Sequence, residues 1–257
     1  MKDAIKRQDV NSFLFTRFAI AFLLMLMIRP RVITLISKDI LLRAGLAGGL
    51  LAIGFIFQTL GLERTTAATA GFITGLYVVT TPLLAFFFQN ERLPSRIWLY
   101  IALATIGLAL LSVHGWAIGT GELYVLAGAF AFGGQIVVLS SWSNGRDPYL
   151  FSFVQIGTCV LISGLAAVLG GFQSPPDKGV WSVAIFTAVF CTALAFFIQT
   201  WAQSHLHSTK VAVILVMEIV FAALFAVLLG KEHLGESVAI GGTLIVVAMY
   251  LIVSQEA

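Results

Sequence analysis

The chain is dominated by nine long apolar stretches, separated from one another by short charged or turn-forming breaks. A helix needs roughly 20 mostly apolar residues to cross the hydrocarbon layer of a membrane, with a range of about 17–25. The stretches span residues 13–28, 40–60, 67–88, 97–113, 123–140, 149–169, 180–203, 209–229 and 238–253. They are too long and too uniformly apolar for the alternating strands of a membrane barrel. The sequence therefore predicts an all-α polytopic membrane protein with about nine transmembrane helices.

The composition agrees with this class and excludes others. Hydrophobic residues make up 59% of the 257 residues and charged residues 11%, against about 45–50% and 25% in soluble domains. The formal net charge is only +3, which gives no indication of nucleic-acid binding. His205 and His207 are two residues apart with no cysteine or carboxylate beside them. We therefore expect no metal site and no other cofactor.

The positions of lysine and arginine predict the orientation. One set of alternate loops holds Arg29, Arg31, Lys38, Arg43, Arg92, Arg96, Arg146 and Lys210, and the other holds Arg64, Lys178 and Lys231. Because loops rich in these residues face the cytoplasm, the first set of loops and the C-terminus are expected on the cytoplasmic side. The membrane is expected to be the cell (inner or plasma) membrane. Nine helices then place the basic tail, with Lys2, Lys6 and Arg7, on the outside, against the rule.

The chain also contains an internal repeat. A shift of 141 residues aligns 41–112 with 182–253, and the matches include the polar pairs Gln58/Gln199, Thr59/Thr200 and Glu91/Glu232. Two further stretches precede the matched part of the second unit, and only one precedes that of the first. The repeat predicts two five-helix units, 1–113 and 121–257, the first lacking its first helix, so that the chain has four plus five.

Because five is an odd number, the two units are expected to be inverted relative to each other. Inverted repeats are frequent in secondary transporters, whose substrate site lies near the midplane where the repeats meet. A further helix is expected immediately before Met1, and it would also account for the position of the basic tail.

Three segments carry a family resemblance. They are Phe13–Ala21, Gly71–Val79 continuing through Pro82 to Leu93, and Met217–Leu224 continuing through Gly230 to Leu234. In these segments the chain resembles the EamA-type branch of the drug/metabolite transporter superfamily. The family often has a proline after the glutamate that corresponds to Glu218, where this chain has Ile219. The resemblance implies a secondary-active exporter of small organic metabolites or drugs that works by alternating access in the lipid bilayer.

Glu218 is the one carboxylate clearly in the middle of an expected span. Because an ionisable group at that depth costs about 2.5–3.5 kcal/mol or more, it needs a reason to be there. Glu218 either binds protons or substrate in a central cavity, or forms a hydrogen bond that pins two helices together. Arg17 can pair with Glu218 or contact an anionic substrate, but the sequence favours snorkelling to the interface.

Three glutamines are further candidates for contact with substrate. Gln58 and Gln199 occupy equivalent positions in the two units, and Gln135 lies within 123–140. A neutral amide offers a donor and an acceptor without the cost of a charge. The alternative is hydrogen bonding between helices, worth about 0.6 kcal/mol on average. That alternative is slightly favoured for Gln58 and Gln199, and the cavity is favoured for Gln135.

The expected helix 67–88 carries a possible gate. Thr74 and Tyr77 precede Pro82, which removes a backbone donor and tends to kink a helix. A kink there is compatible with a gate or a binding lip, although prolines are often merely tolerated in membrane helices. Gly71 and Gly75, four residues apart, predict close packing against a neighbouring helix.

The sequence lacks a phosphate-binding glycine loop and any soluble segment long enough for an ATPase domain. Transport is therefore expected without ATP hydrolysis, and the protein is not expected to be an enzyme. Two alternatives stay open. An intramembrane enzyme acting on lipid-linked substrates needs acid/base or metal groups clustered at one depth. A non-transporting or inactive truncated scaffold needs no such cluster. A homodimer is a further open prediction.

Overall fold

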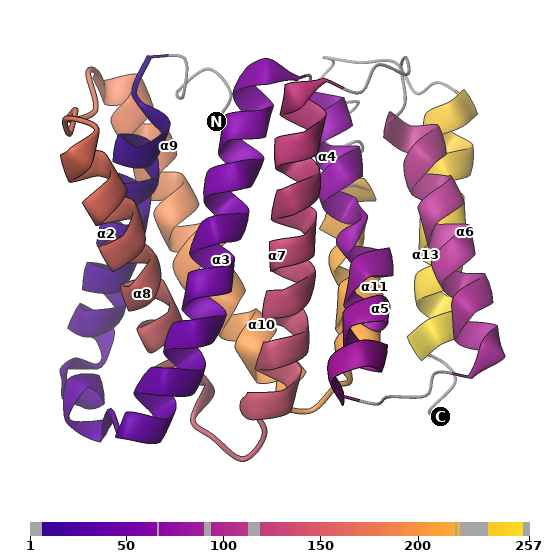
Figure 1. Ribbon diagram of the computed structural model, residues 1–257, viewed down its shortest axis with the longest axis horizontal. Coiled ribbons are helices and arrows are strands. Elements are labelled where there is room, and N and C mark those ends of the chain that lie inside the picture. Colours follow the sequence, from indigo (N-terminus) through magenta and orange to yellow (C-terminus); the bar gives the residue numbers. More distant parts are fainter. Residues whose placement is uncertain are drawn as a thin grey trace.

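The computed structural model describes residues 7–65, 67–89, 94–112, 119–218, 220–221 and 236–253. The described residues form helices joined by turns and short loops, without a strand. The elements are α2 (Val10–Ile28), η1 (Pro30–Leu35), α3 (Lys38–Arg64), α4 (Ala67–Gly75), α5 (Tyr77–Gln89), α6 (Ser95–Ser112), α7 (Thr120–Trp142), α8 (Pro148–Leu169), α9 (Lys178–Ala188), η2 (Val189–Leu194), α10 (Ala195–Gln203), α11 (Ser208–Leu215) and α13 (Glu236–Val253). Figure 1 shows the long helices roughly parallel to one axis, with consecutive spans running in opposite directions.

Four of the helices begin at a polar side chain that accepts a hydrogen bond from the first turn of the backbone. These residues are Asp9 for α2, Ser37 for α3, Asp147 for α8 and Asp177 for α9. Such N-caps satisfy backbone N–H groups that have no partner within the helix. The short polar breaks between apolar stretches therefore determine where these helices start.

The all-α membrane architecture is confirmed. Six helices of the described part of the chain are long and apolar enough to cross a membrane, at 10–28, 38–64, 69–88, 120–142, 148–169 and 178–203. A shorter apolar helix lies at 95–107. Helix α11 begins the expected span 209–229, and most of the remainder of that span lies outside the described residues. The number of nine spans and the inverted relation of the two units stay predictions.

Two of the expected spans are not continuous α-helices. The stretch 67–88 divides into α4 and α5 at Leu76, and 180–203 contains the π-helical turn η2 between α9 and α10. Within η2 the hydroxyl of Thr192 donates a hydrogen bond to the carbonyl of Thr187, five residues earlier, at 2.9 Å. A π turn of this kind disturbs the regular backbone bonding and is often found at functional sites.

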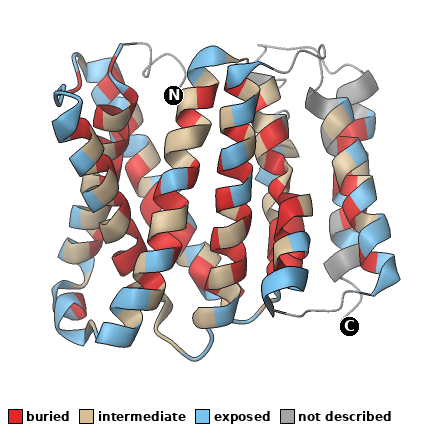
Figure 2. Cartoon of the chain, viewed as in Figure 1, coloured by how far each residue is buried: buried red, intermediate tan, exposed pale blue. Residues whose placement is uncertain are grey.

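The helices pack around two main apolar cores. The first lies between α2, α3, α8 and η2, and the second between α5, α6, α11 and α13. Helix α7 joins them, because Leu139 belongs to the first core and Ile136 to the second. Many large apolar side chains, such as Met27, Phe87 and Leu161, are exposed. Figure 2 shows exposed residues along the outside of the bundle, as expected where side chains face lipid.

One cation that was expected in a loop is not there. Lys210 lies in the first turn of α11 and is buried. The helix begins at Ser208, so Lys210 lies inside it and packs against neighbouring helices.

Candidate functional site

Arg17 lies at the centre of the first polar site and is buried, with 4% of its surface exposed. Its Nε donates to the hydroxyl of Thr192 at 2.7 Å, and its Nη2 donates to the carbonyl of Cys191 at 2.9 Å. The guanidinium carbon also lies 4.8 Å from the centre of the Phe55 ring. The expectation that Arg17 snorkels to the interface is therefore wrong, because the fold supplies its partners inside the bundle.

The π turn explains why Arg17 finds a partner on the backbone of η2. In an α-helix the N–H of Ala195 donates to the carbonyl four residues earlier, which is that of Cys191. Here the N–H of Ala195 donates to the carbonyl of Thr192 instead. The Cys191 carbonyl is thus without that bond and accepts one from Arg17.

Glu218 is the carboxylate that interacts electrostatically with Arg17. It lies three residues beyond the end of α11, and its side chain is exposed. Its charge interacts with Arg17 of α2 and with Tyr77 of α5. Among the described residues no ion pair joins Arg17 to Glu218 within 4.0 Å. Arg17 and Glu218 therefore interact electrostatically without forming a direct ion pair.

A chain of amides forms the second polar site. Gln135 on α7 donates to Gln155 on α8 at 3.0 Å and accepts from Gln199 on α10 at 3.2 Å. Gln155 donates in turn to the hydroxyl of Thr200 at 3.3 Å. Gln135, Gln155 and Thr200 are buried. Three helices are therefore connected by side chains in the interior of the bundle.

The amide chain extends along α10 to one further glutamine. Gln199 also donates to Gln203 at 3.0 Å, and Gln203 donates to the carbonyl of Ile136 at 2.8 Å and to the hydroxyl of Ser140 at 3.0 Å. Sequence reasoning missed Gln155 and Gln203. Both were visible as amides within expected spans, and the four-residue spacing of Gln199 and Gln203 places them on the same helix face.

Gln58 and Thr74 lie apart from this chain but next to each other. Gln58 on α3 donates to the hydroxyl of Thr74 on α4 at 3.1 Å, and both side chains are half-buried. Gln58 and Gln199 are equivalent in the repeat, and each bonds within its own unit, Gln58 to α4 and Gln199 to α7. Their roles in substrate contact stay predictions.

Tyr77 begins α5 directly after the break in the helix, and it is buried. The interruption lies at Leu76, whereas Pro82 lies inside α5. Glu91 and Glu232, one of the polar pairs of the repeat, lie outside the described residues. The backbone break thus lies at Leu76, six residues before Pro82, and the role of this helix as a gate stays a prediction.

Replacing Gln155 with leucine is expected to lower the free energy of unfolding by about 1 kcal/mol, because it removes two interhelical bonds of about 0.6 kcal/mol each. Thermal unfolding in detergent measures the change. Gln58→Leu, which removes a single bond to Thr74, serves as the matched comparison and should have about half that effect. An unchanged midpoint for Gln155→Leu would contradict a structural contribution of the amide chain.

The chain matches a family of transporters over almost its whole length. Residues 1–113 and 119–254 match the model of a family described as the EamA-like transporter family. An uncharacterized transporter from Archaeoglobus fulgidus is 33% identical over 200 residues, which cover 78% of this chain and 65% of the relative. An uncharacterized transporter from Synechocystis sp. is 25% identical over 236 residues, covering 82% of this chain and 70% of the relative.

A crystal structure, described only as that of a protein, has a similar fold. Its TM-score is 0.73 at 18% sequence identity, and the match covers 95% of this chain and 85% of that one. At this identity the likeness shows the fold alone. The chain spans 65% of the length of the archaeal relative.

Proposed function

This chain belongs to the EamA-like transporter family, and on that premise we propose that it is a secondary-active carrier of small organic solutes. It exports them across the cell membrane by alternating access between its two units. The family and the relatives named above are transporters. Coupling to protons through Glu218 is part of the proposal.

One observation carries this proposal: Arg17, the buried cation of the first sequence unit, has its hydrogen-bond partners in the second. Arg17 of the first unit bonds to Thr192 and Cys191 of the second. Glu218 of the second unit acts electrostatically on Arg17 and on Tyr77 of the first. Charges at this depth are costly and are retained where they serve a pathway or a proton relay. A relative movement of the two units would remake these contacts.

The helix bounds support the inverted repeat. A shift of 141 residues places α6 (Ser95–Ser112) on α13 (Glu236–Val253) at both ends, and the start of α4 on that of α11. Helices α6 and α13 pack against each other and run in opposite directions (Figure 1). Equivalent helices related by a two-fold axis in the membrane plane have this relation.

The distribution of cations supports a cytoplasmic C-terminus. The α2–α3 connection and the α7–α8 turn lie at one end of the bundle (Figure 1), joined by the bond from Arg146 to Asp39 at 2.9 Å. Arg29, Arg31 and Lys38 also belong to this end. Such an excess of lysine and arginine marks the cytoplasmic side.

Flux into proteoliposomes tests the proposal with three probes of similar size: an organic cation, an organic anion and a zwitterion. We expect at least one solute to be driven uphill by a pH gradient. Glu218→Gln is expected to abolish the uphill flux and to preserve solute exchange without a gradient, because the amide cannot carry the proton.

Glu63→Gln is the matched control. It is the same substitution of glutamate by glutamine, made at the end of α3 beside Arg64. Its uphill flux should equal that of the wild type. Gradient-driven flux that survives in Glu218→Gln would refute proton coupling through this residue. Absence of exchange for all three solutes would contradict the carrier itself.

A further inference from the structure

A cavity lies at the connection between α2 and α3, away from the buried polar groups. It has a volume of about 470 Å³ and is lined by Ile28, Arg29, Pro30, Arg31, Thr34 and Leu35. The connection joins the ends of two membrane-spanning helices. The cavity therefore lies at the level of the lipid headgroups.

Arg29 forms a fixed positive wall of this cavity. Its Nη1 lies 2.5 Å from Oδ2 of Asp147, and its guanidinium lies 5.8 Å from the centre of the Tyr149 ring. The hydroxyl of Tyr149 donates to the carbonyl of Met25 at 2.5 Å, which ties the ring to the end of α2. Arg29 is thus oriented before any ligand arrives.

Arg31 supplies a second, available cation. Its side chain is exposed, and its guanidinium forms no hydrogen bond or ion pair with the described residues. Lys38, at the start of α3, is also exposed. The guanidinium of Arg31 can therefore bind an anionic group that does not belong to the described residues.

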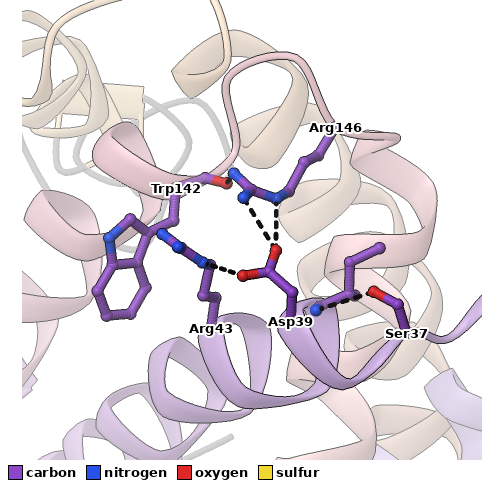
Figure 3. A network of polar contacts seen from close by, with 6 residues as sticks. Ser37, Asp39, Arg43, Trp142 and Arg146 are labelled. Atoms are coloured by element: carbon purple, nitrogen blue, oxygen red, sulfur yellow. Dashed lines mark hydrogen bonds and ion pairs between the residues drawn. The ribbon is translucent and has the colours of Figure 1, made fainter.

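The nearby carboxylates, Asp39 and Asp147, are already engaged by arginines other than Arg31. Figure 3 shows Asp39 between Arg43 and Arg146, with bonds of 2.5 Å and 2.9 Å, while Arg146 also donates to the carbonyl of Trp142 at 2.6 Å. Asp147 is held by Arg29. This end of the bundle therefore keeps an excess of positive charge around the cavity.

The same segment exposes apolar side chains beside its cations. Ile28 is 67% exposed and Leu35 is 47% exposed, and both line the cavity. Val32 is fully buried and fastens η1 to the core of the bundle. A ligand that fits has a negative group next to an apolar chain.

We propose that this cavity binds an anionic phospholipid of the adjoining leaflet. Arg31 contacts the phosphate, Arg29, held in place by Asp147, forms the wall beside it, and the acyl chains lie along Ile28 and Leu35. Basic pockets at the ends of transmembrane helices bind anionic headgroups in this way, and each nearby cation adds about 1 kcal/mol of attraction. This site does not depend on the proposed transport.

Native mass spectrometry of the full chain in neutral detergent tests the proposal with phosphatidylglycerol and phosphatidylcholine as probes. We expect wild type to retain phosphatidylglycerol in preference to phosphatidylcholine. Arg31→Gln should bind phosphatidylglycerol about fivefold more weakly, the factor that corresponds to one cation near the surface. Its binding of phosphatidylcholine should be unchanged.

Arg96→Gln is the matched control, because Arg96 is an exposed arginine near the start of α6, far along the chain from the cavity. Equal weakening by Arg31→Gln and Arg96→Gln would show a general charge effect and would overturn the site. Displacement of the lipid by millimolar inorganic phosphate would identify a soluble anion as the ligand and would also overturn it. Thermal unfolding of both variants checks that they are folded.

Discussion

Arg17→Ala is expected to abolish uphill transport and to lower the free energy of unfolding by roughly 3–5 kcal/mol. The guanidinium donates two hydrogen bonds, to Thr192 and to the carbonyl of Cys191. Bonds to a charged group are worth about 1.5–3 kcal/mol each. The carbonyl of Cys191 in η2 loses the hydrogen bond from Arg17. Glu218 loses its electrostatic interaction with the guanidinium. Flux into proteoliposomes and thermal unfolding in detergent measure the two effects.

Arg17→Lys separates charge from geometry. The lysine keeps the positive charge for Glu218, but its single ammonium lacks the planar fork that reaches two acceptors. We expect stability between that of wild type and Arg17→Ala, with part of the transport retained. Arg96→Ala, at an exposed arginine, should change the stability by no more than about 0.5 kcal/mol. If Arg17→Ala were as stable and as active as Arg96→Ala, the role given to Arg17 would be wrong.

The spans were predictable because the membrane itself fixes their length. An uninterrupted apolar run of the right size has one stable solution in hydrocarbon, a helix whose backbone bonds are internal. The predicted start at residue 149 and the observed start of α8 at Pro148 therefore differ by one residue. The same argument says nothing about how each helix is rotated, which depends on its neighbours.

Because the sequence does not give the rotation of α2 about its axis, the environment of Arg17 could not be predicted from it. Snorkelling is favoured when an arginine near a helix end can reach water, and the sequence shows only its position in α2. Burial depends on η2, where a π turn exposes a carbonyl at the matching height. Nothing in the residues Val189–Leu194 announces such a turn. The partner of Arg17 therefore becomes visible only in three dimensions.

The amide chain was predictable in part. Gln135 and Gln199 were singled out as polar groups within spans, and they bond to each other. Gln155 links them to Thr200, and its place could have been found by considering every amide within a span.

Helix packing shows the same limit for small residues. Gly71 was expected at a close helix contact, but a methyl group added there would meet no atom within 4 Å. The close approach lies instead on α3, where a Cβ at Gly48 would lie 2.5 Å from the carbonyl oxygen of Gln155 and 2.8 Å from its Cα. The close contact expected at Gly71 is therefore not found in the direction in which a Cβ would point. The rotation of a helix about its axis decides which of its glycines faces a neighbouring helix.

Gly48→Ala is accordingly expected to destabilise the protein by about 1–3 kcal/mol, as overpacking does. The added methyl group meets backbone atoms of α8, which cannot yield as a side-chain end does. It pushes α3 away from the point where Gln155 holds Gln135, and it disturbs the bond from the Cys159 thiol to the Gly48 carbonyl at 3.4 Å. Thermal unfolding in detergent and solute exchange in proteoliposomes should both fall.

The next residue supplies the control. A Cβ at Gly49 would meet no atom within 4 Å, so Gly49→Ala should gain stability by about 0.5–1 kcal/mol, the ordinary advantage of alanine over glycine inside a helix. The two variants make the same chemical change one residue apart in α3, and their midpoints should move in opposite directions. Movement in the same direction would mean that helix propensity, and not the contact with α8, decides the stability here.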